Sequence, residues 1–394
     1  AARAPPCACV PPLLACALSG AARAGGMAGR PAPGAFRKYP KMDETSGPVG
    51  AAPGAGRYVL TEKVHGANFC LLARRGADGQ VDVRFAKRTA VLGGEAEAED
   101  FYSCRSTGLL GELAPKAKAV LAQLGEETAA AHVYGELFGG RYPHPDVQPV
   151  PALQPVQCGV WYCPDIRFLA FDVAVESPDD AGVPQRRFLD FAEARRTCEA
   201  AGLMFVAPLL EGTLSECVDF CEVFETTIPQ RLGLPRILDA GDGNPNNAEG
   251  VVVRPAREPA GRNGEPPECR GLFKRKAAAF SEKRYQNSDW RRGREGGAGR
   301  APELAREELA RIELQACAVP ARLHAVQSKV GRVDTRDRPA VLELLGLFKE
   351  DVREALEDED RAALDASPAL QAALDDFCKD CMRSELLAGR RGTG

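Results

Sequence analysis

No stretch of the sequence approaches the ~18 consecutive apolar residues that a membrane-spanning helix needs. The run CVPPLLACAL is short and is broken by prolines, so we expect no membrane partner. The formal net charge of the 394 residues is only -4, which means that the whole protein is not a polycation. Any contact with nucleic acid would therefore have to come from a local basic groove.

The fourteen cysteines are scattered, and a chain of 394 residues is too large to be a small disulfide scaffold. The nearest approach to a metal signature is Cys378-Lys-Asp-Cys381, which has no second pair and no downstream histidines. A structural zinc site needs about four such ligands. We therefore interpret most cysteines as reduced thiols, and this pair as part of a terminal helix.

Acidic residues are absent from residues 1–42, where positive charges occur at Arg3, Arg23, Arg30, Arg37, Lys38 and Lys41. This composition is typical of an organelle transit segment, which would place the protein in a mitochondrion or a chloroplast. It is equally compatible with a disordered leader rich in alanine, proline and glycine, with translation starting at Met27 and the protein staying in the cytoplasm. Both interpretations stay open.

After residue 56 the pattern changes to short alternating apolar runs separated by turn residues. Such runs predict strands, and we expect them at 57–64, 68–75, 81–88, 132–140, 166–175, 250–256 and 270–277. A helix is predicted at 114–127, entered through Pro115, and another at 187–202, ended by Gly202.

Beyond residue 300 the strand signal disappears, and runs such as AVLELLGLFKEDVREALED show helical spacing of apolar residues. Residues 289–300 are glycine-rich and basic, which is typical of a flexible linker. The sequence therefore predicts an α+β fold, with a mixed domain at 43–288 and a helical domain at 301–394. The prolines from Pro143 to Pro155 indicate a long loop to which we assign no role.

Lys63, in the stretch TEKVHGANF, is the first of several distinctive residues set at the ends of apolar strands. The others follow in the order Arg88, Glu136, Phe171, Asp172, Glu249, Lys274 and Lys276. Each of them alone is most simply a solvated edge charge or a core aromatic residue. The order and the residue types of the whole set are much more specific.

This ordered set resembles the nucleotidyltransferase motifs of covalent ATP-dependent ligases, specifically those of the RNA ligase 2 family, which includes a phage enzyme and the mitochondrial RNA-editing ligases. DNA ligases and messenger-RNA capping enzymes carry Lys-x-Asp-Gly where this chain has Lys63-Val64-His65-Gly66. The resemblance extends from about Phe36 to the end, since VPARLHAVQSKVGRV is similar to the helical domain of the phage enzyme. It implies a two-sheet adenylylation domain followed by a small all-helical C-terminal domain.

The resemblance implies that Lys63 attacks ATP and forms a lysyl-AMP intermediate, with Mg2+ as cofactor. The AMP then passes to the 5′-phosphate of an RNA end, and the 3′-hydroxyl of another end displaces it and seals the strand. The attacking amine must be unprotonated, and two cations near it, Lys274 and Lys276, would disfavour a third positive charge. The same cations would neutralise charge as pyrophosphate departs.

The remaining site residues take their expected roles from the same resemblance. Asn68 and Arg88 are expected at the phosphates, Glu136 at the ribose hydroxyls and Phe171 on the adenine face. Glu249 is expected to position metal or phosphate, and Glu62 belongs to the nucleotide-binding set. His65 is expected to brace the loop with phosphate-side contacts, and Asp172 to orient its neighbours.

Two further functions stay open. One is a DNA ligase or capping-type transferase with another acceptor, or with GTP in place of ATP, and the other is an inactive RNA-binding subunit. An inactive copy has no chemical reason to retain Lys63, Glu136, Glu249, Lys274 and Lys276 together. For the ligase we expect RNA with 5′-phosphate and 3′-hydroxyl ends, held as a nicked duplex, and a monomer or a component of an RNA-processing assembly.

Overall fold

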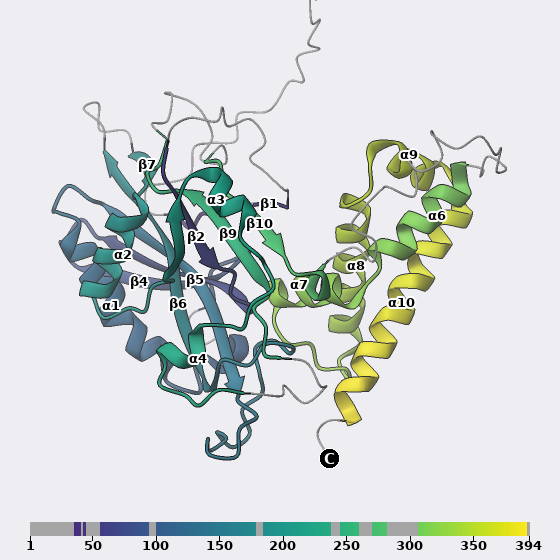
Figure 1. Cartoon of the computed structure of the whole chain (residues 1–394), viewed down its shortest axis with the longest axis horizontal. Coiled ribbons are helices and arrows are strands. Elements are labelled where there is room, and N and C mark those ends of the chain that lie inside the picture. Colours follow the sequence, from purple (N-terminus) through teal and green to yellow (C-terminus); the bar gives the residue numbers. More distant parts are fainter. Residues whose placement is uncertain are drawn as a thin grey trace, which may run out of the picture. The chain divides into compact units, whose positions relative to one another are not determined.

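The computed structural model describes residues 35–40, 42–44, 56–93, 100–178, 184–237, 245–259, 270–281 and 306–391, which belong to one compact unit. Most of the leader expected at 1–42 and the whole linker expected at 289–300 lie outside the described residues. The described part is α+β, because two five-stranded sheets come first and a group of helices follows (Figure 1). The expected fold class is confirmed.

The first sheet has the strand order β1-β10-β9-β2-β8. Its strands are β1 (Asp43–Glu44), β2 (Tyr58–Glu62), β8 (Pro208–Gly212), β9 (Gly250–Pro255) and β10 (Phe273–Lys276). β9 is antiparallel to both β2 and β10, with Gly250 opposite Lys276. This register brings the end of β2 to the start of β9, where Lys63 N donates to Gly250 O over 2.9 Å.

The second sheet has the strand order β4-β3-β5-β6-β7. Its strands are β3 (Ala67–Arg75), β4 (Val81–Lys87), β5 (Ala130–Arg141), β6 (Cys163–Pro178) and β7 (Pro184–Phe188). Asn68 on β3 lies opposite Glu136 on β5, so two residues predicted for nucleotide binding are neighbours across the ladder. Each strand expected from the alternating pattern is present in one of the two sheets.

Helix α1 (Leu109–Gln123) begins earlier than the sequence predicted, and Pro115 lies inside it rather than at its entrance. A proline inside a helix costs about 3 kcal/mol, because it removes one backbone hydrogen bond and crowds the preceding turn. Leu109, Leu110 and Leu113 are all buried. Burial of a leucine side chain contributes about 1.5–3 kcal/mol, so these contacts offset the cost of the proline.

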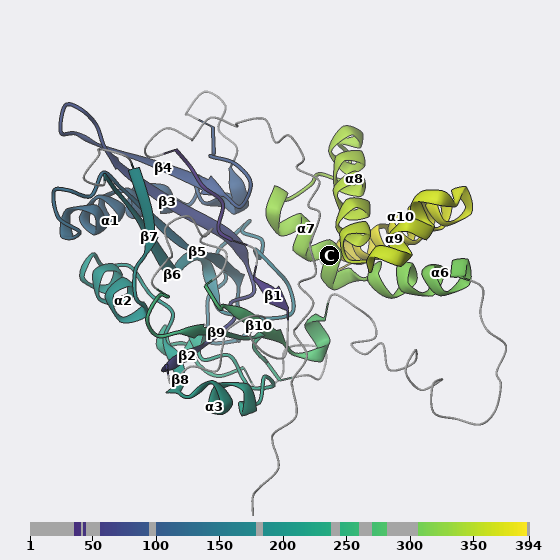
Figure 2. The same cartoon turned by 90° about the horizontal axis from the view of Figure 1, so that it is seen from above.

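The remaining helices of the sheet region are short: α2 (Phe191–Ala200), α3 (Leu214–Asp219) and α4 (Ile228–Arg231), with 3-10 turns at Phe101–Ser103 and Ala278–Phe280. α2 starts later than expected, because residues 184–188 pair with β6 as strand β7. Gly202 follows α2 with φ at +76° and ends it as predicted. α1 and α2 lie beside one another along the second sheet (Figure 2), and their apolar faces bury its core.

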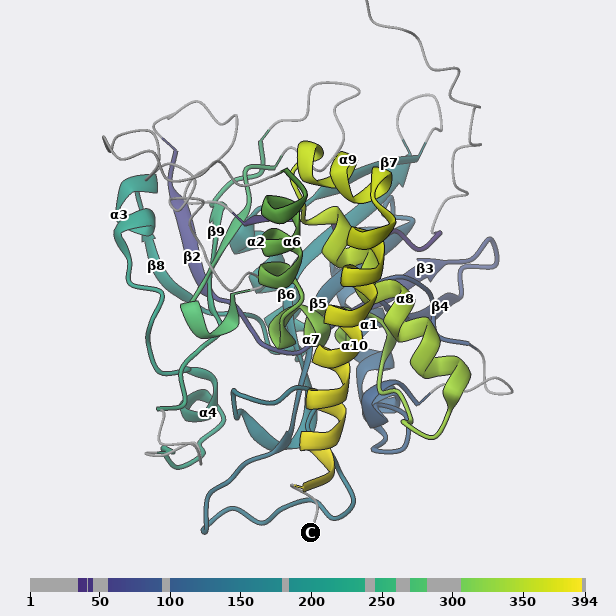
Figure 3. The same ribbon diagram turned by 90° about the vertical axis from the view of Figure 1, so that its right-hand side faces the viewer.

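The C-terminal part of the described chain consists of α6 (Arg306–Cys317), α7 (Pro320–Val330), α8 (Arg338–Glu354), α9 (Asp358–Ala366) and α10 (Pro368–Arg391). These helices share a hydrophobic core of their own, and α10 runs the length of the group (Figure 3). Cys378 and Cys381 lie on α10 in this core, where burial raises the pKa of both thiols. Within the described ranges, no helix is both long and apolar enough to cross a membrane.

Residues 35–40, which the sequence assigned to the leader, lie against the second sheet. Tyr39 is 4% exposed, and its ring packs on those of Tyr134 and Phe188 with centroids 5.1 and 6.1 Å away. The Tyr134 hydroxyl donates to Arg37 O over 2.7 Å. The acid-free composition therefore continues into residues that belong to the folded core, and composition alone could not show where the core begins.

Candidate active site

A cleft of about 1630 Å³ is lined by residues of both sheets and of helices α7 and α8. Most of the residues predicted for the site lie on it: Glu62, Lys63, His65, Asn68, Arg88, Glu136, Phe171, Glu249, Lys274 and Lys276. Asp172 is not part of the lining. The strands that carry these residues are far apart in the sequence, so the fold is what brings them together.

Lys63 is fixed by an ion pair. Its Nζ donates to Glu249 Oε2 over 2.7 Å, and the other carboxylate oxygen lies 3.2 Å from Lys276 Nζ. The Lys63 side chain is 18% exposed and the Glu249 side chain 6%, so the lysine can be reached from the cleft while the carboxylate is largely enclosed. We expected cations around Lys63, and the structure adds a carboxylate that two lysines share.

Three hydrogen bonds hold His65. Its backbone N–H donates to the Tyr162 hydroxyl over 2.8 Å, Nε2 lies 3.0 Å from Cys158 O, and Nδ1 lies 3.1 Å from Glu249 Oε2. A carbonyl oxygen and an ionised carboxylate can only accept hydrogen bonds. Both ring nitrogens of His65 therefore face an acceptor. These contacts favour the bracing role predicted for it.

Glu249 is the negative centre of this cluster. Burial alone would raise the pKa of Glu249, but the charges of Lys63, His65 and Lys276 hold it well below its usual range. One negative charge then faces the charges of two lysines and the His65 ring. The excess of positive charge favours the binding of a polyphosphate in the cleft.

Glu136 lines the same cleft but has no hydrogen-bond or ion-pair partner within the part of the chain that the structure describes. Removal from water raises the pKa of its carboxyl group to about 8, while the Lys63 charge opposes the rise and the Glu249 charge adds to it. The side chain is half-buried, so its carboxyl group can be reached from the cleft. It suits the contact with ribose hydroxyls that we predicted.

Phe171 reaches the cleft from β6 and is supported from behind by Tyr39, whose ring meets it edge to face at 5.0 Å. The cleft is also lined by Lys38, Tyr39 and Met42. These residues were not predicted for the site, because they lie in the segment expected to be a leader. Phe36 and Tyr39 are the first two aromatic residues of the chain, which was the available signal that the leader ends before them.

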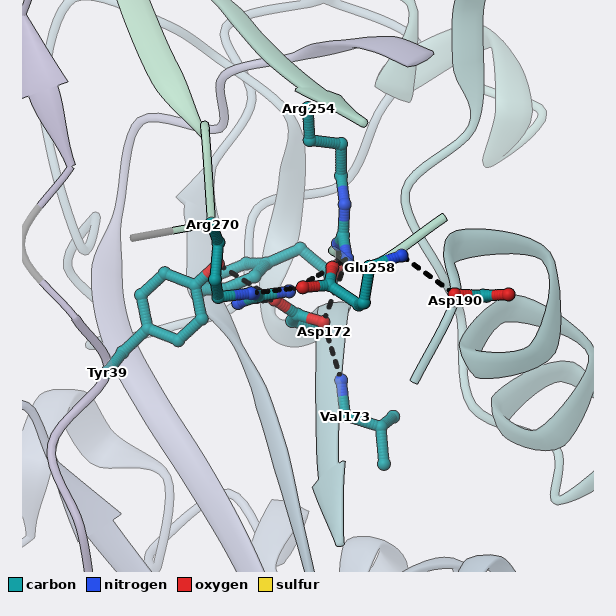
Figure 4. A network of polar contacts seen from close by, with 8 residues as sticks. Tyr39, Asp172, Val173, Asp190, Arg254, Glu258 and Arg270 are labelled. Carbon is teal, nitrogen blue, oxygen red and sulfur yellow. Dashed lines mark hydrogen bonds and ion pairs between the residues drawn. The ribbon is translucent and has the colours of Figure 1, made fainter. Parts of the chain in front are cut away.

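Asp172, next to Phe171, lies in a buried network of charges rather than on the cleft (Figure 4). Its carboxylate accepts hydrogen bonds from Tyr39 Oη over 2.9 Å, Arg270 Nη1 over 2.7 Å and Arg254 Nη2 over 3.3 Å. Burial would raise the pKa of Asp172, but the two guanidinium groups and the tyrosine hydroxyl hold it below its usual range. Glu258 pairs with both arginines. Asp172 therefore organises the wall behind Phe171.

Glu62 borders the cleft, but its carboxylate is occupied. Oε2 accepts from Thr227 N over 2.9 Å and from Thr227 Oγ1 over 2.8 Å, and Oε1 accepts from Thr226 Oγ1. Burial raises the pKa of Glu62, and these hydrogen bonds oppose the rise. The side chain fastens the 226–228 turn to β2, so a nucleotide would meet this carboxylate only by displacing the threonines.

The described residues contain no group of three His, Cys, Asp or Glu side chains that could hold a metal ion. In nucleotide sites magnesium uses one or two carboxylates together with water and phosphate oxygens. Glu249 and Glu136 both lie close enough to Lys63 for its charge to lower the pKa of their carboxyl groups. Glu249 fits an ion that arrives on the nucleotide, because its pKa is held low and its carboxylate therefore stays ionised.

Two curated proteins of Trypanosoma brucei brucei are similar to this chain. The mitochondrial RNA-editing ligase 2 is 29% identical over 269 residues, a match that covers 63% of this chain and 61% of the relative. The mitochondrial RNA-editing ligase 1 is 30% identical over 229 residues, covering 52% of this chain and 45% of the relative. The chain thus spans less than two thirds of the length of either relative.

Solved structures are more distant in sequence. An archaeal ATP-dependent RNA ligase is 16% identical with a TM-score of 0.33, and the match covers 90% of this chain and 67% of that one. The Naegleria gruberi RNA ligase with pyrophosphate is 16% identical with a TM-score of 0.30, covering 57% of this chain and 50% of that one.

The RNA ligase family matches residues 56–276 of this chain. This range contains every residue predicted for the site, from Glu62 to Lys276, and both sheets apart from the short strand β1. Since the match extends over more than half of the 394 residues, the chain belongs to the RNA ligase family.

Proposed function

We propose that this protein is an ATP-dependent RNA ligase in which Lys63 forms the covalent lysyl-AMP intermediate. The observation that carries the proposal is the 2.7 Å ion pair between Lys63 and Glu249, set in a cleft of about 1630 Å³ that can hold a nucleotide. A lysine at the exposed end of a strand, with no role in a site, would be surrounded by water. This one is held against a nearly buried carboxylate and still reaches the cleft.

In the first step the Lys63 amine attacks the α-phosphorus of ATP, so that a nitrogen–phosphorus bond forms and the bond to pyrophosphate breaks. The lysine must first lose a proton, and its partial exposure lets that proton pass to water in the cleft. When Lys63 turns to the phosphate, His65 and Lys276 stay beside Glu249. The carboxylate is therefore not left as an uncompensated buried charge, which would be costly.

The rest of the cleft suits the other parts of the nucleotide. Phe171 would stack on the adenine, Glu136 would accept hydrogen bonds from the ribose, and Asn68, Arg88 and Lys274 would contact the phosphates. Magnesium bound to the phosphates supplies positive charge that stabilises the departing pyrophosphate. Glu249 would hold the waters of that ion.

We propose RNA with 5′-phosphate and 3′-hydroxyl ends, held as a nicked duplex, as the acceptor of the AMP. The helices support this, since Arg322 and Lys329 of α7 line the cleft and both pair with Asp351 of α8 at 2.7 Å. Ordered cations on a cleft wall are suited to phosphate contacts. In this proposal residues 43–288 form the adenylylation domain, 289–300 the linker and 301–394 the domain that engages RNA.

The first experiment separates the candidate functions. The protein is incubated with ATP or GTP labelled at the α-phosphate, and then with nicks in RNA–RNA, RNA–DNA and DNA–DNA duplexes. We expect labelling by ATP only and sealing of nicks that contain RNA. Labelling by GTP alone would indicate a capping-type transferase, sealing of DNA alone a DNA ligase, and no labelling by either nucleotide an inactive RNA-binding subunit.

The proposed division of labour is tested by shortening the chain. A protein that ends near residue 290 should still label itself with AMP, because the residues around Lys63 precede that point, but it should seal nicks poorly. If the shortened protein sealed RNA as well as the full chain does, residues 301–394 would not engage RNA.

We also propose a mitochondrial location and a monomer that can enter an RNA-processing assembly. Both curated relatives are named as mitochondrial, and residues 1–42 carry positive charges without any acidic residue. Residues 1–60 fused to a fluorescent protein should direct it to mitochondria, and a diffuse cytoplasmic signal would contradict the location. Light scattering of the purified protein would test for the monomer.

A further inference from the structure

The loop 142–162 includes the prolines from Pro143 to Pro155 to which the sequence assigned no role, and it supplies two of the three hydrogen bonds that hold His65. The Cys158 carbonyl lies 3.0 Å from Nε2, and the Tyr162 hydroxyl accepts from the His65 backbone N–H over 2.8 Å. The third contact is Glu249. The orientation of His65 beside Lys63 therefore depends on where this loop lies.

The same loop is held from its other side by the helical part of the chain. Arg332, just after α7, donates from Nη2 to Gln154 O over 2.5 Å and to Pro155 O over 3.0 Å. Gln157 Nε2 donates to His324 O on α7 over 3.3 Å. Residues 154–162 thus connect α7 and Arg332 directly to His65.

The connection is stiff along its length. Val156 N donates to Gly139 O over 2.9 Å, and Trp161 exchanges two hydrogen bonds, of 2.8 and 2.7 Å, with the Asn246 side chain. Gly140 has φ at +93°, and a Cβ there would lie 2.3 Å from Gln154 O. The segment 154–162 therefore begins in close contact with β5. Residues 154–162 are therefore fastened to β5 and to Asn246 as well as to α7.

The side chain of Arg332 packs on Tyr102, a residue with an unfavourable backbone conformation. Its guanidinium lies over the Tyr102 ring, 5.3 Å from the centroid, and the Tyr102 hydroxyl donates to Gln327 O of α7 over 3.3 Å. Tyr102 has φ at +49°, a region that non-glycine residues rarely occupy and that the surrounding structure must enforce. The strain indicates that the position of this ring against α7 matters to the fold.

We propose that residues 154–162 are a positioning segment that couples the docking of α7 and Arg332 to the orientation of His65. The inference rests on the proposed ligase function. Once Lys63 carries AMP its amine no longer pairs with Glu249, and among the described residues the contacts of that carboxylate with His65 and Lys276 remain. The coupling therefore acts mainly on the steps after lysyl-AMP formation, and Arg332 is a positioning residue for AMP transfer and sealing.

The test compares Arg332→Ala, Arg332→Lys and Arg336→Ala in the full chain. Lysine can restore the contacts, because a single nitrogen of Arg332 makes both carbonyl bonds. Arg336 is an exposed arginine near the same turn and serves as the matched control. Arg332→Ala should slow sealing about tenfold while self-adenylylation stays within about twofold of the wild type. Arg332→Lys should recover most of the sealing rate. Arg336→Ala should change neither the sealing rate nor the rate of self-adenylylation.

A second readout follows His65 directly. The chain has only four histidines, so the ring resonances of His65 can be resolved by NMR after selective labelling and assigned with His65→Gln. Arg332→Ala should shift the His65 signal and Arg332→Lys should return it. An unchanged His65 signal, or an unchanged sealing rate, overturns the proposal. If Arg332→Ala does not fold, Gln157→Ala is measured in the same way, since it removes the bond to His324 O.

The two readouts keep this inference apart from the proposed function. A wild-type protein that never labels with AMP would contradict the ligase function, and the NMR comparison would still report whether Arg332 and His65 are coupled. A wild-type protein that labels and seals, with variants that leave His65 unmoved, would contradict the coupling alone.

Discussion

The side chain of Lys63 is paired with that of Glu249, 186 positions further along the sequence, and its backbone is bonded to the next residue, Gly250. Their side chains meet at 2.7 Å, and the Lys63 backbone N–H donates over 2.9 Å to the carbonyl of Gly250, the residue that follows the glutamate. The lysine is therefore placed by the register of β2 against β9 and not by a free loop. The backbone of the proposed nucleophile is thus held by the sheet, and only its side chain has to turn to reach a phosphate.

Replacement of the nucleophile gives the most direct prediction. Lys63→Ala should lower AMP labelling about 10³-fold or more, because no other amine takes the same place in the cleft. The protein should stay folded, since His65 and Lys276 still compensate Glu249. Labelling is measured with ATP on denaturing gels and folding by circular dichroism. Lys118→Ala, at an exposed position on α1, is the control, and normal labelling by Lys63→Ala would remove the lysine from the mechanism.

Acid should remove the contribution of Glu249 to stability. Its pKa is held below the unfolded value of about 4.3, so the native state gains stability from this group above that pH and loses it as the pH falls toward the folded value. Glu249→Gln should cost about 3–5 kcal/mol at pH 7, because it removes the charged carboxylate that Lys63 and Lys276 share. Thermal unfolding of both proteins between pH 7 and 3 should show the difference shrinking in acid. A difference that is constant with pH would contradict the assignment.

Glu136 should behave in the opposite way. Its pKa of about 8 lies above the unfolded value, so the native state prefers the protonated form and loses stability as the pH rises from about 4.3 to about 8. Glu136→Gln, which cannot ionise, should raise the melting temperature at pH 9 in the absence of nucleotide and weaken ATP binding. Glu112→Gln, on the exposed side of α1, should do neither. Equal melting temperatures of wild type and Glu136→Gln at pH 9 would contradict the raised pKa.

The strands and most of the residues that line the cleft could be predicted from the sequence, because local patterns of residues indicate both. Alternating apolar residues predict the strands. Charged residues at the strand ends, such as Lys63, Glu249 and Lys276, interrupt that pattern and can be recognised. The helix through Pro115 was misplaced, since a favourable N-terminal position for proline was weighed without the burial of the preceding leucines. Tertiary burial outweighed local preference there.

The partners of the site residues could not be read from the sequence. Whether a carboxylate faces a ligand or a protein group depends on long-range contacts, as the threonines that occupy Glu62 illustrate. Tyr39 was hidden in a segment with the composition of a leader, and Cys158 holds His65 through its backbone carbonyl. Backbone carbonyls and hydroxyl groups leave no recognisable signature in a sequence.

The role of Asp172 can be separated from catalysis by an isosteric change. Asp172→Asn leaves Arg254 and Arg270 with one fewer negative charge in a buried network, and breaking such a pairing costs about 3–5 kcal/mol. We expect a large drop in the free energy of unfolding, measured with urea, and a labelling rate per folded molecule that stays close to that of the wild type. Asp82→Asn is the control, because Asp82 pairs with Arg84 at the exposed surface, where the change should stay within about 0.5 kcal/mol. A variant with wild-type stability and no AMP labelling would instead place Asp172 in the chemistry itself.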